Sequence, residues 1–347
     1  MKGVFVVFEI NNRRYTGSKF KIREWIRKLI KNNCSNCDSF CDIFAGTGVI
    51  TSTMINDYNK YILNDILYSN EVIYKAFFSK GNYREDVLYK FYGKYKNIDE
   101  NLLVDNYVSE NYGDKYFSLL DAKKIGYIRE DIELNKGNLL EREYNILLTS
   151  LVYSFDRCAN TVGHYEAYFK NKQIKPNFEF ELVSPIVKSN SDIDVEITRE
   201  DANILCKKKS ADIVYIDPPY SSRQYSRFYH VIETIIKWDK PELFGVARKP
   251  IPENMSEYCT SKAIDSFREL IYSLDTKYIV VSYNNTYDSK SKSSENKMTL
   301  EQIKSVLSNK GKTDVFSKKH SAFNAGKTNF KEHKEFIFIT KVGEFDE

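Results

Sequence analysis

Short apolar runs separated by amphipathic stretches dominate this chain, and that pattern predicts an α/β protein. Five apolar runs have the length of buried strands, at residues 39–44, 61–63, 212–216, 277–283 and 335–340. Apolar residues at helical spacing predict an amphipathic helix over 22–30, with Lys19 just before or within its first turn. A further helix is predicted over 228–236, with Ser226 as its cap.

The amino-terminal part of the pattern has the order of a nucleotide-binding unit. The run 39–44 leads into the turn Gly46-Thr47-Gly48, residues at helical spacing follow, and the run 61–63 ends at Asn64-Asp65. Strand, glycine turn, helix, strand and acid together form half of a doubly wound unit. We therefore predict an α/β, Rossmann-like sheet with helices on both faces.

Residues 70–190 have a different character. They are rich in tyrosine and charge, largely helical in pattern and poor in glycine, and an insert of this length is too long for a loop. We expect one domain formed by 1–69 and 191–347, with 70–190 inserted in it as a mostly helical subdomain. The insert carries 17 basic and 18 acidic residues, so it cannot be a simple phosphate-binding surface.

Composition excludes several classes of protein. With 42% hydrophobic and 29% charged residues the chain is globular, and no run approaches the length of a transmembrane helix. The opening VFVVFEI is too short for a secretory signal. Six cysteines without a closely spaced even framework favour a reducing cytoplasm, and Cys34 and Cys37 have no second ligand pair, so we expect no metal.

The charge distribution says more than the net charge, which is only +4. Residues 1–30 carry eight Lys and Arg against two Glu, and Arg223 and Arg227 follow a conspicuous proline pair. A solvated charged face would explain any single one of these residues equally well. The basic amino-terminal segment is therefore a candidate for contact with nucleic acid, in which Arg13 and Arg14 would take part.

The glycine turn favours an adenosyl ligand over a dinucleotide. Asp65 ends the next strand 19 residues beyond Gly46, where a carboxylate can accept the two hydroxyls of a ribose. The third glycine of the dinucleotide motif is missing, so a pyrophosphate is not expected. Two Gly-Lys-Thr triplets, at 311–313 and 326–328, lack the glycine that a phosphate loop needs and are predicted to be turns.

The stretch Asp217-Pro218-Pro219-Tyr220 follows the apolar run 212–216 directly. Open α/β sheets bind ligands at the carboxyl ends of their strands. The prolines restrict the backbone, so the Asp217 carboxylate and the Pro218 carbonyl become two rigid acceptors beside a ring that can stack. The alternative is that the prolines merely end a strand and Tyr220 packs in the core.

A flat aromatic amine with two N–H donors, such as the exocyclic amino group of adenine, suits this pair of acceptors. Its lone pair is delocalised into the ring and is a poor nucleophile. Two acceptors that hold its hydrogens would favour a more tetrahedral nitrogen, and they would stabilise the positive charge that develops as it attacks a methyl sulfonium. No strong base is required.

Three motifs of the chain, and the order in which they occur, resemble those of a known family. Tyr15-Thr16-Gly17-Ser18-Lys19, the segment FCDIFAGTG at 40–48 and Asp217-Pro218-Pro219-Tyr220 occur in the order found in the D12 class of adenine-specific DNA methyltransferases, which includes the Dam type and many restriction-modification methylases. Residues 150–170 and the segment RQYSRFYHVIE after the prolines add to the similarity. The resemblance implies an S-adenosylmethionine-dependent methyltransferase sheet.

The resemblance also implies roles for individual residues. Tyr15 and Lys19 would hold the methionine end of S-adenosylmethionine, Asp65 its ribose and Asp201 its adenine, although a helix cap is an equally good explanation of Asp201. The glycine loop would lie against the cofactor with Asp42, Phe44, Ala45, Gly46, Thr47 and Gly48. The catalytic group would be Asp217, Pro218, Pro219 and Tyr220.

Double-stranded DNA is the partner that the resemblance implies, with residues 70–190 as target-recognition region. The target adenine would be flipped out of the duplex and stacked on Tyr220. Arg223, Gln224 and Tyr225 would lie at the lip of the base pocket, or only brace the loop. We expect a monomer or weak dimer without a membrane, and a separately encoded restriction endonuclease is a possible partner.

Other functions can be set against this one. Methylation of amino groups in RNA or protein would use the same chemistry, and a cytosine methylase would more often carry serine in place of Asp217. A non-catalytic nucleic-acid-binding relative would have no reason to keep the acid, the prolines and the tyrosine together. A nicotinamide-dependent oxidoreductase would need a pyrophosphate loop, which this turn lacks.

Overall fold

The structure is a computed structural model that describes residues 8–285, 296–319 and 333–345. The chain divides into two compact units. We call the first the helical unit; it comprises Met1–Thr16, Leu67–Ser191 and Ser226–Glu253. The second, the sheet unit, comprises Gly17–Ile66, Asp192–Tyr225 and Asn254–Glu347. In the described ranges, no helix is long and apolar enough to cross a membrane.

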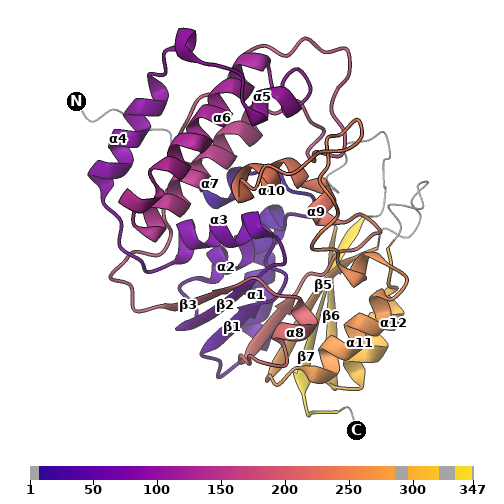
Figure 1. Ribbon diagram of the computed structural model, residues 1–347. Coiled ribbons are helices and arrows are strands. Elements are labelled where there is room, and N and C mark those ends of the chain that lie inside the picture. Colours follow the sequence, from indigo (N-terminus) through magenta and orange to yellow (C-terminus); the bar gives the residue numbers. More distant parts are fainter. Residues whose placement is uncertain (1–7, 286–295, 320–332, 346–347) are drawn as a thin grey trace. The chain divides into compact units, whose positions relative to one another are not determined.

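A seven-stranded sheet forms the centre of the sheet unit (Figure 1). Its order is β3-β2-β1-β4-β5-β7-β6, in which neighbouring strands are parallel except that β7 runs antiparallel to both β5 and β6. The strands are β1 (Ser39–Asp42), β2 (Lys60–Asn64), β3 (Asp194–Thr198), β4 (Ile213–Ile216), β5 (Tyr278–Asn284), β6 (Gly311–Lys319) and β7 (Lys334–Val342). The predicted doubly wound α/β fold is confirmed.

Each of the five predicted apolar runs forms a strand, whereas β3 and β6 were not predicted. Both lie at the edges of the sheet and are partly exposed, so their apolar pattern is weak. The prediction of a turn at 311–313 was wrong, because Gly311 begins β6 and pairs with Val342. The second triplet, at 326–328, lies outside the described residues.

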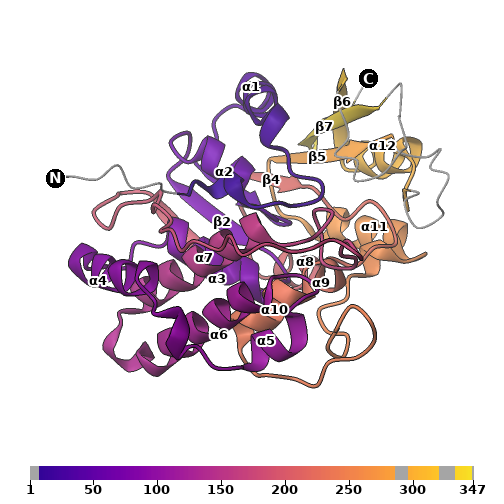
Figure 2. The ribbon, with the colours of Figure 1, turned by 90° about the horizontal axis from the view of Figure 1, so that it is seen from above.

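Helices cover both faces of the sheet (Figure 2). On one face lie α1 (Arg23–Asn33) and α2 (Val49–Met54), and on the other lie α8 (Ala202–Leu205), α11 (Ala263–Ser273) and α12 (Leu300–Ser308). On the second face, the short 3₁₀ helix η5 (Glu257–Cys259) precedes α11. Lys19 directly precedes the 3₁₀ helix η2 (Phe20–Ile22), which leads into α1. The helix predicted over 22–30 is therefore confirmed by α1.

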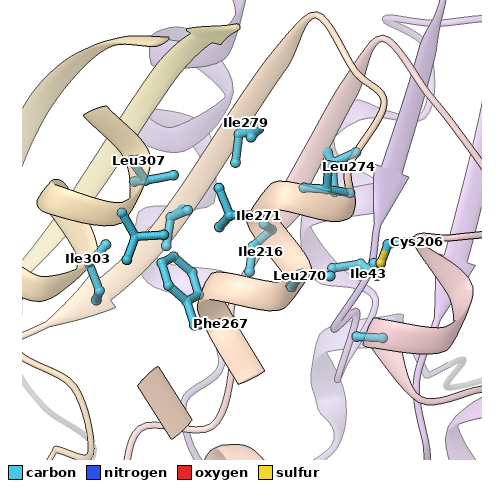
Figure 3. Close-up of a cluster of buried hydrophobic side chains, with 14 of the residues drawn as sticks. Ile43, Cys206, Ile216, Phe267, Leu270, Ile271, Leu274, Ile279, Ile303 and Leu307 are labelled. Atoms are coloured by element: carbon cyan, nitrogen blue, oxygen red, sulfur yellow. The ribbon is translucent and has the colours of Figure 1, made fainter. Parts of the chain in front are cut away.

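The core between the sheet and the second helical layer holds the strands in place (Figure 3). Ile216 of β4 and Ile279 of β5 pack against Phe267, Leu270 and Ile271 of α11, and all five side chains are fully buried. Burial of one such aliphatic side chain contributes roughly 1.5–3 kcal/mol. This packing fixes β4 next to β5, and with it the point at which the loop after β4 leaves the sheet.

The helical unit is built around α7 (Glu141–Cys158), which is buried along most of its length because three helices pack against it: α3 (Tyr68–Phe78), α6 (Leu119–Leu134) and α10 (His230–Lys237). The predicted cap at Ser226 was wrong: α10 begins at His230, while Ser226 belongs to the preceding turn α9 (Tyr225–Phe228). The other helices of this unit are η1 (Ile10–Asn12), α4 (Glu85–Lys96), η3 (Glu100–Leu102), α5 (Tyr107–Tyr112) and η4 (Lys136–Asn138).

Candidate active site

Two loops that are far apart in the sequence meet at one edge of the sheet. The Asp217 loop follows β4, and the glycine loop follows β1, which is the parallel neighbour of β4. The amide of Ile43 donates a 3.1 Å hydrogen bond to the carbonyl of Tyr215 and ties the two strand ends together. The carboxyl ends of adjacent parallel strands are where α/β sheets bind ligands, so this edge is the candidate site.

Asp217 is held by two groups at once. Its Oδ2 lies 2.8 Å from Nζ of Lys19, and its Oδ1 accepts a hydrogen bond from the hydroxyl of Tyr220. Lys19 also donates to Tyr220 and, at 3.2 Å, to the carbonyl of Gly17. The structure therefore brings together Lys19, Asp217 and Tyr220, which the sequence analysis had assigned to cofactor binding and to catalysis.

A second carboxylate joins this group from β7. Oε1 of Glu335 lies 3.5 Å from Nζ of Lys19 and 3.3 Å from the hydroxyl of Tyr220. It also accepts a 2.7 Å hydrogen bond from the hydroxyl of Ser282 on β5. Sequence reasoning missed Glu335, because an acid at the start of an apolar strand carries no signal of its own. We call Lys19, Asp217, Tyr220 and Glu335 the Lys19 cluster.

The Lys19 cluster contains one buried carboxylate, Glu335, one partly buried carboxylate, Asp217, and one buried ammonium group. Burial raises the pKa of Asp217, and the negative charge of Glu335 raises it further, while the nearby Lys19 lowers it. Burial lowers the pKa of Lys19, but Asp217 and Glu335 raise it, with the net effect that it stays above its ordinary value. Lys19 therefore remains charged and is shared by the two acids.

The ring of Tyr220 is fixed from several sides. It meets the ring of Tyr283 edge to face, with centroids 4.9 Å apart, and the ammonium of Lys19 lies 4.8 Å from its centroid. The main-chain carbonyl of Tyr220 accepts a 2.8 Å hydrogen bond from the amide of Lys297. Tyr220 remains half-buried, as does Pro219, while Pro218 is buried. These contacts hold Tyr220 in place within the loop that the two prolines were predicted to make rigid.

The glycine loop bends through two left-handed residues. Gly46 has φ 53° and Gly48 has φ 72°, and the amide of Gly48 donates to the carbonyl of Ala45 at 2.7 Å. Side chains other than glycine rarely adopt such angles. Thr47 is buried, and Phe44 packs edge to face against Tyr258. The result is a tight turn in which Phe44 and Gly46 are partly exposed and Ala45, Thr47 and Gly48 are buried.

Two acids frame this turn. Asp65, which follows β2, accepts a 3.0 Å hydrogen bond from the amide of Gly46 through Oδ2. Asp42 is 1% exposed; its Oδ2 accepts a 3.0 Å hydrogen bond from Thr51, while its Oδ1 is buried and has no hydrogen-bond partner among the described residues. Burial raises the pKa of Asp42 to about 7, against the effect of the Thr51 hydrogen bond.

Asp201 caps the amino terminus of α8, because its Oδ1 accepts a 2.9 Å hydrogen bond from the amide of Asn203. The helix-cap explanation is therefore confirmed for one of its oxygens. The cap does not test whether Asp201 binds the adenine of a cofactor, and that role stays a prediction.

The segment after the prolines is braced to the loop before α11. Gln224 exchanges two hydrogen bonds with Ser256: its Nε2 donates to the carbonyl at 2.9 Å, and its Oε1 accepts from the amide at 2.8 Å. The carbonyl of Arg223 accepts a hydrogen bond from the thiol of Cys259. Gly17 has φ 83°, and a Cβ there would lie 3.2 Å from the hydroxyl of Tyr225. Bracing is thus the observed role of Gln224.

Tyr15, Arg13 and Arg14 belong to the helical unit. Tyr15 stacks on Tyr229, with ring centroids 4.7 Å apart. Arg13 is only 6% exposed and donates a 2.8 Å hydrogen bond to Asn70, so its contact with DNA stays a prediction. The amide of Arg14 donates to Asp156, and its guanidinium donates to the carbonyl of Ala159.

The six cysteines lie at separate places in the described part of the chain. All six are free thiols, and no group of three or more His, Cys, Asp or Glu residues suited to a metal occurs in the part of the chain that the structure describes. Burial raises the pKa of Cys34 to about 12, and the Cys37 thiol donates to the carbonyl of Ser35.

Comparison with known proteins places this geometry in context. The D12 class N6 adenine-specific DNA methyltransferase family matches residues 15–291. Type II methyltransferase M.NlaIII of Neisseria lactamica is 30% identical over 92% of this chain and 95% of that protein. Modification methylase LlaI of Lactococcus lactis subsp. lactis is 32% identical over 78% of this chain and 46% of that protein, and Type II methyltransferase M.FokI of Planomicrobium okeanokoites is 30% identical over 87% and 48%.

The chain thus spans about half the length of LlaI and M.FokI, and nearly the whole of M.NlaIII. The family match covers the glycine loop, Asp65, Asp201 and the Asp217 loop. With this match and these relatives, the chain belongs to the D12 class of N6 adenine-specific DNA methyltransferases.

Proposed function

We propose that this chain transfers a methyl group from S-adenosylmethionine to N6 of an adenine in a specific duplex DNA sequence, as the modification enzyme of a restriction-modification system. The observation that carries the proposal is the meeting of the Asp217 loop and the glycine loop at one edge of the sheet. Membership in the D12 class supports N6 of adenine as acceptor, and the names of the relatives as Type II modification methylases support the biological setting.

The residues around the glycine loop fit an adenosyl cofactor with a charged amino acid end. In the left-handed turn at Gly46 and Gly48, Gly46 is partly exposed between the buried Ala45 and Thr47, and it has no side chain that would keep a ligand from its backbone. Oδ1 of Asp42 is a buried acceptor without a partner among the described residues, as a site for an ammonium group requires. Asp65 would accept from the ribose.

Other residues would complete the cofactor site. Lys19 would attract a carboxylate, and Phe44 offers an apolar edge to the ligand. Asp201 caps its helix through Oδ1, and a carboxylate has further lone pairs for an adenine amino group. Tyr15, in the helical unit, would take part as the family resemblance implies. When bound, the cofactor supplies an electrophilic methyl group on a sulfonium.

Asp217 and Pro218 would act on the amino group of the adenine. The Asp217 carboxylate and the Pro218 carbonyl accept its two hydrogens, which orients the nitrogen lone pair for in-line attack on the methyl carbon. The negative charge of Asp217 would stabilise the cationic nitrogen that forms when this nitrogen takes the methyl group and the sulfur keeps the bonding electrons. Asp217 then accepts the proton that this nitrogen releases, and its raised pKa suits it to do so.

DNA recognition would use both units. An amino group at N6 is paired inside the duplex, so the target adenine must leave the stack, and the half-buried ring of Tyr220 beside Pro219 would receive it. We assign target recognition to residues 70–190, whose charges nearly cancel, so that base contacts rather than phosphate contacts would give specificity. Arg14, Arg223 and Tyr225 remain candidates for contact with DNA.

Transfer of a labelled methyl group from S-adenosylmethionine to unmethylated duplex DNA tests the proposal. Asp217→Asn keeps the size of the side chain and one acceptor oxygen, so transfer should fall about 100-fold or more while cofactor binding persists. Glu269→Gln, which removes an exposed acid that pairs with Lys207, is a matched control and should leave transfer unchanged. Transfer to RNA or protein but not to DNA, or full activity of Asp217→Asn, would refute it.

A further inference from the structure

The Lys19 cluster poses a problem for the proposed reaction. Asp217 must accept a hydrogen from the adenine, but in this structure one of its oxygens faces Lys19 at 2.8 Å and the other accepts from Tyr220. One acceptor site on each oxygen is therefore taken, and the ammonium offsets the negative charge with which Asp217 would hold the amino group and stabilise its cation. Removing Lys19 from Asp217 without another anion nearby would leave a buried, unpaired charge, which is costly.

Glu335 provides that other anion. Its Oε1 lies 3.5 Å from the same Nζ, so a small rotation of the lysine side chain would replace one carboxylate by the other. The hydroxyl of Tyr220 is likewise 3.3 Å from Glu335. Ser282 fixes Glu335 through a 2.7 Å hydrogen bond, and both acids are on strands or loops of the same unit.

We propose that Glu335 is a positioning residue that takes over Lys19 and the Tyr220 hydroxyl when adenine enters, and so releases the Asp217 carboxylate to accept the amino hydrogens. The inference rests on the proposed function. No covalent bond changes in this exchange, and Lys19 keeps its proton. Two acids around one ammonium also leave one surplus negative charge where the cationic nitrogen forms, which favours the transition state.

Loss of the Glu335 charge should therefore leave Lys19 held by Asp217 alone. For Glu335→Gln we expect kcat for methyl transfer to fall by up to about 100-fold, since the reacting groups are no longer free to align. The dissociation constant for S-adenosylmethionine should not rise, because the glycine loop and Asp65 are untouched and Lys19, with one acid fewer beside it, attracts the carboxylate of the cofactor at least as strongly. Glu335→Asp keeps the charge on a shorter side chain and should recover much of the lost kcat.

The pH profile separates this role from a purely structural one. Asp217 must be ionised, so activity is lost as the pH falls through its raised pKa. Besides Lys19, Tyr220 and Glu335, the titratable groups that face this cluster are Asp42, the buried Tyr215, whose raised pKa keeps its hydroxyl neutral, and His333, whose pKa is lowered by burial. Glu335→Gln removes one negative neighbour, so the acid limb should move to lower pH by about one unit; Glu335→Asp should leave it in place.

A structure of the wild-type chain with target duplex and S-adenosylhomocysteine tests the exchange without any variant. We expect Nζ of Lys19 within hydrogen-bond distance of Glu335 and farther from Asp217 than the 2.8 Å observed here. Lys19 still on Asp217 with adenine bound, or wild-type kcat and an unmoved acid limb in Glu335→Gln, would overturn the inference alone. Absence of transfer by the wild type would instead refute the proposed function.

Discussion

The amide of Gly46 donates a 3.0 Å hydrogen bond to Oδ2 of Asp65. The acid that the sequence suggests for a ribose therefore also holds the glycine loop in its turn. A carboxylate has lone pairs for both tasks, since each oxygen accepts two hydrogen bonds. Removal of the whole side chain would thus confuse a lost ligand contact with a lost loop contact.

Asp65→Asn separates these two effects. An asparagine that turns its oxygen toward Gly46 preserves the loop but presents an amide donor to the ribose, so we expect the dissociation constant for S-adenosylhomocysteine to rise by roughly 10-fold. Asp65→Ala should weaken binding more and also lower the melting temperature. Isothermal titration calorimetry with a parallel thermal melt would measure both, and unchanged affinity in Asp65→Asn would exclude a ribose contact.

Asp42 should make the stability of the ligand-free chain depend on pH. Its folded pKa of about 7 lies above that of an unfolded aspartate, so its contribution is complete below the unfolded pKa and is lost as the pH rises through about 7. Asp42→Asn carries no charge at any pH. The free energy of unfolding of Asp42→Asn minus that of the wild type should therefore be about 2–4 kcal/mol larger near pH 8 than near pH 5.

Urea titrations of both proteins near pH 5 and near pH 8 would check this difference. Thr51 is a suitable second site, because Thr51→Val removes the hydroxyl that donates to Asp42 and should raise the pKa of Asp42 further. Equal stability differences at the two pH values would show that Asp42 is ionised in the folded chain throughout.

Gly48→Ala should strain the glycine loop. The residue has φ 72° at the start of α2, and an alanine in a left-handed conformation costs about 1–2 kcal/mol. We expect a lower melting temperature together with weaker cofactor binding, because the turn would have to shift. Gly93→Ala in α4, where an added Cβ meets nothing within 4 Å, is the matched control and should be neutral or slightly stabilising.

Gln224→Ala distinguishes bracing from DNA contact. Loss of the two hydrogen bonds to Ser256 should destabilise the loop by about 1–3 kcal/mol in total. If bracing is its whole role, the salt dependence of DNA binding will be that of the wild type, whereas an Arg223→Ala variant with a phosphate contact would show a shallower slope. Fluorescence anisotropy over a range of salt concentrations would give both slopes.

Local patterns made much of the fold predictable. The apolar runs that became β1, β2, β4, β5 and β7 are buried strands, and burial of β-branched and aromatic residues leaves a clear signal in sequence. The edge strands β3 and β6 were missed because a half-exposed strand has no continuous apolar run. The start of α10 was misplaced because a separate turn, α9, precedes it.

The sequence by itself determined which residues stand at the ends of strands: the proline pair, the two left-handed glycines and the acids beside them are local features with local physical causes. Only the tertiary structure decided which of them meet. Glu335 lies 115 residues after Tyr220, yet the pairing of β5 with β7 brings both residues to the ammonium group of Lys19. In the same way, the burial of Arg13 depends on Asn70 and Tyr229, which are distant in the chain, as well as on the nearby Tyr15, because burial results from packing between distant segments.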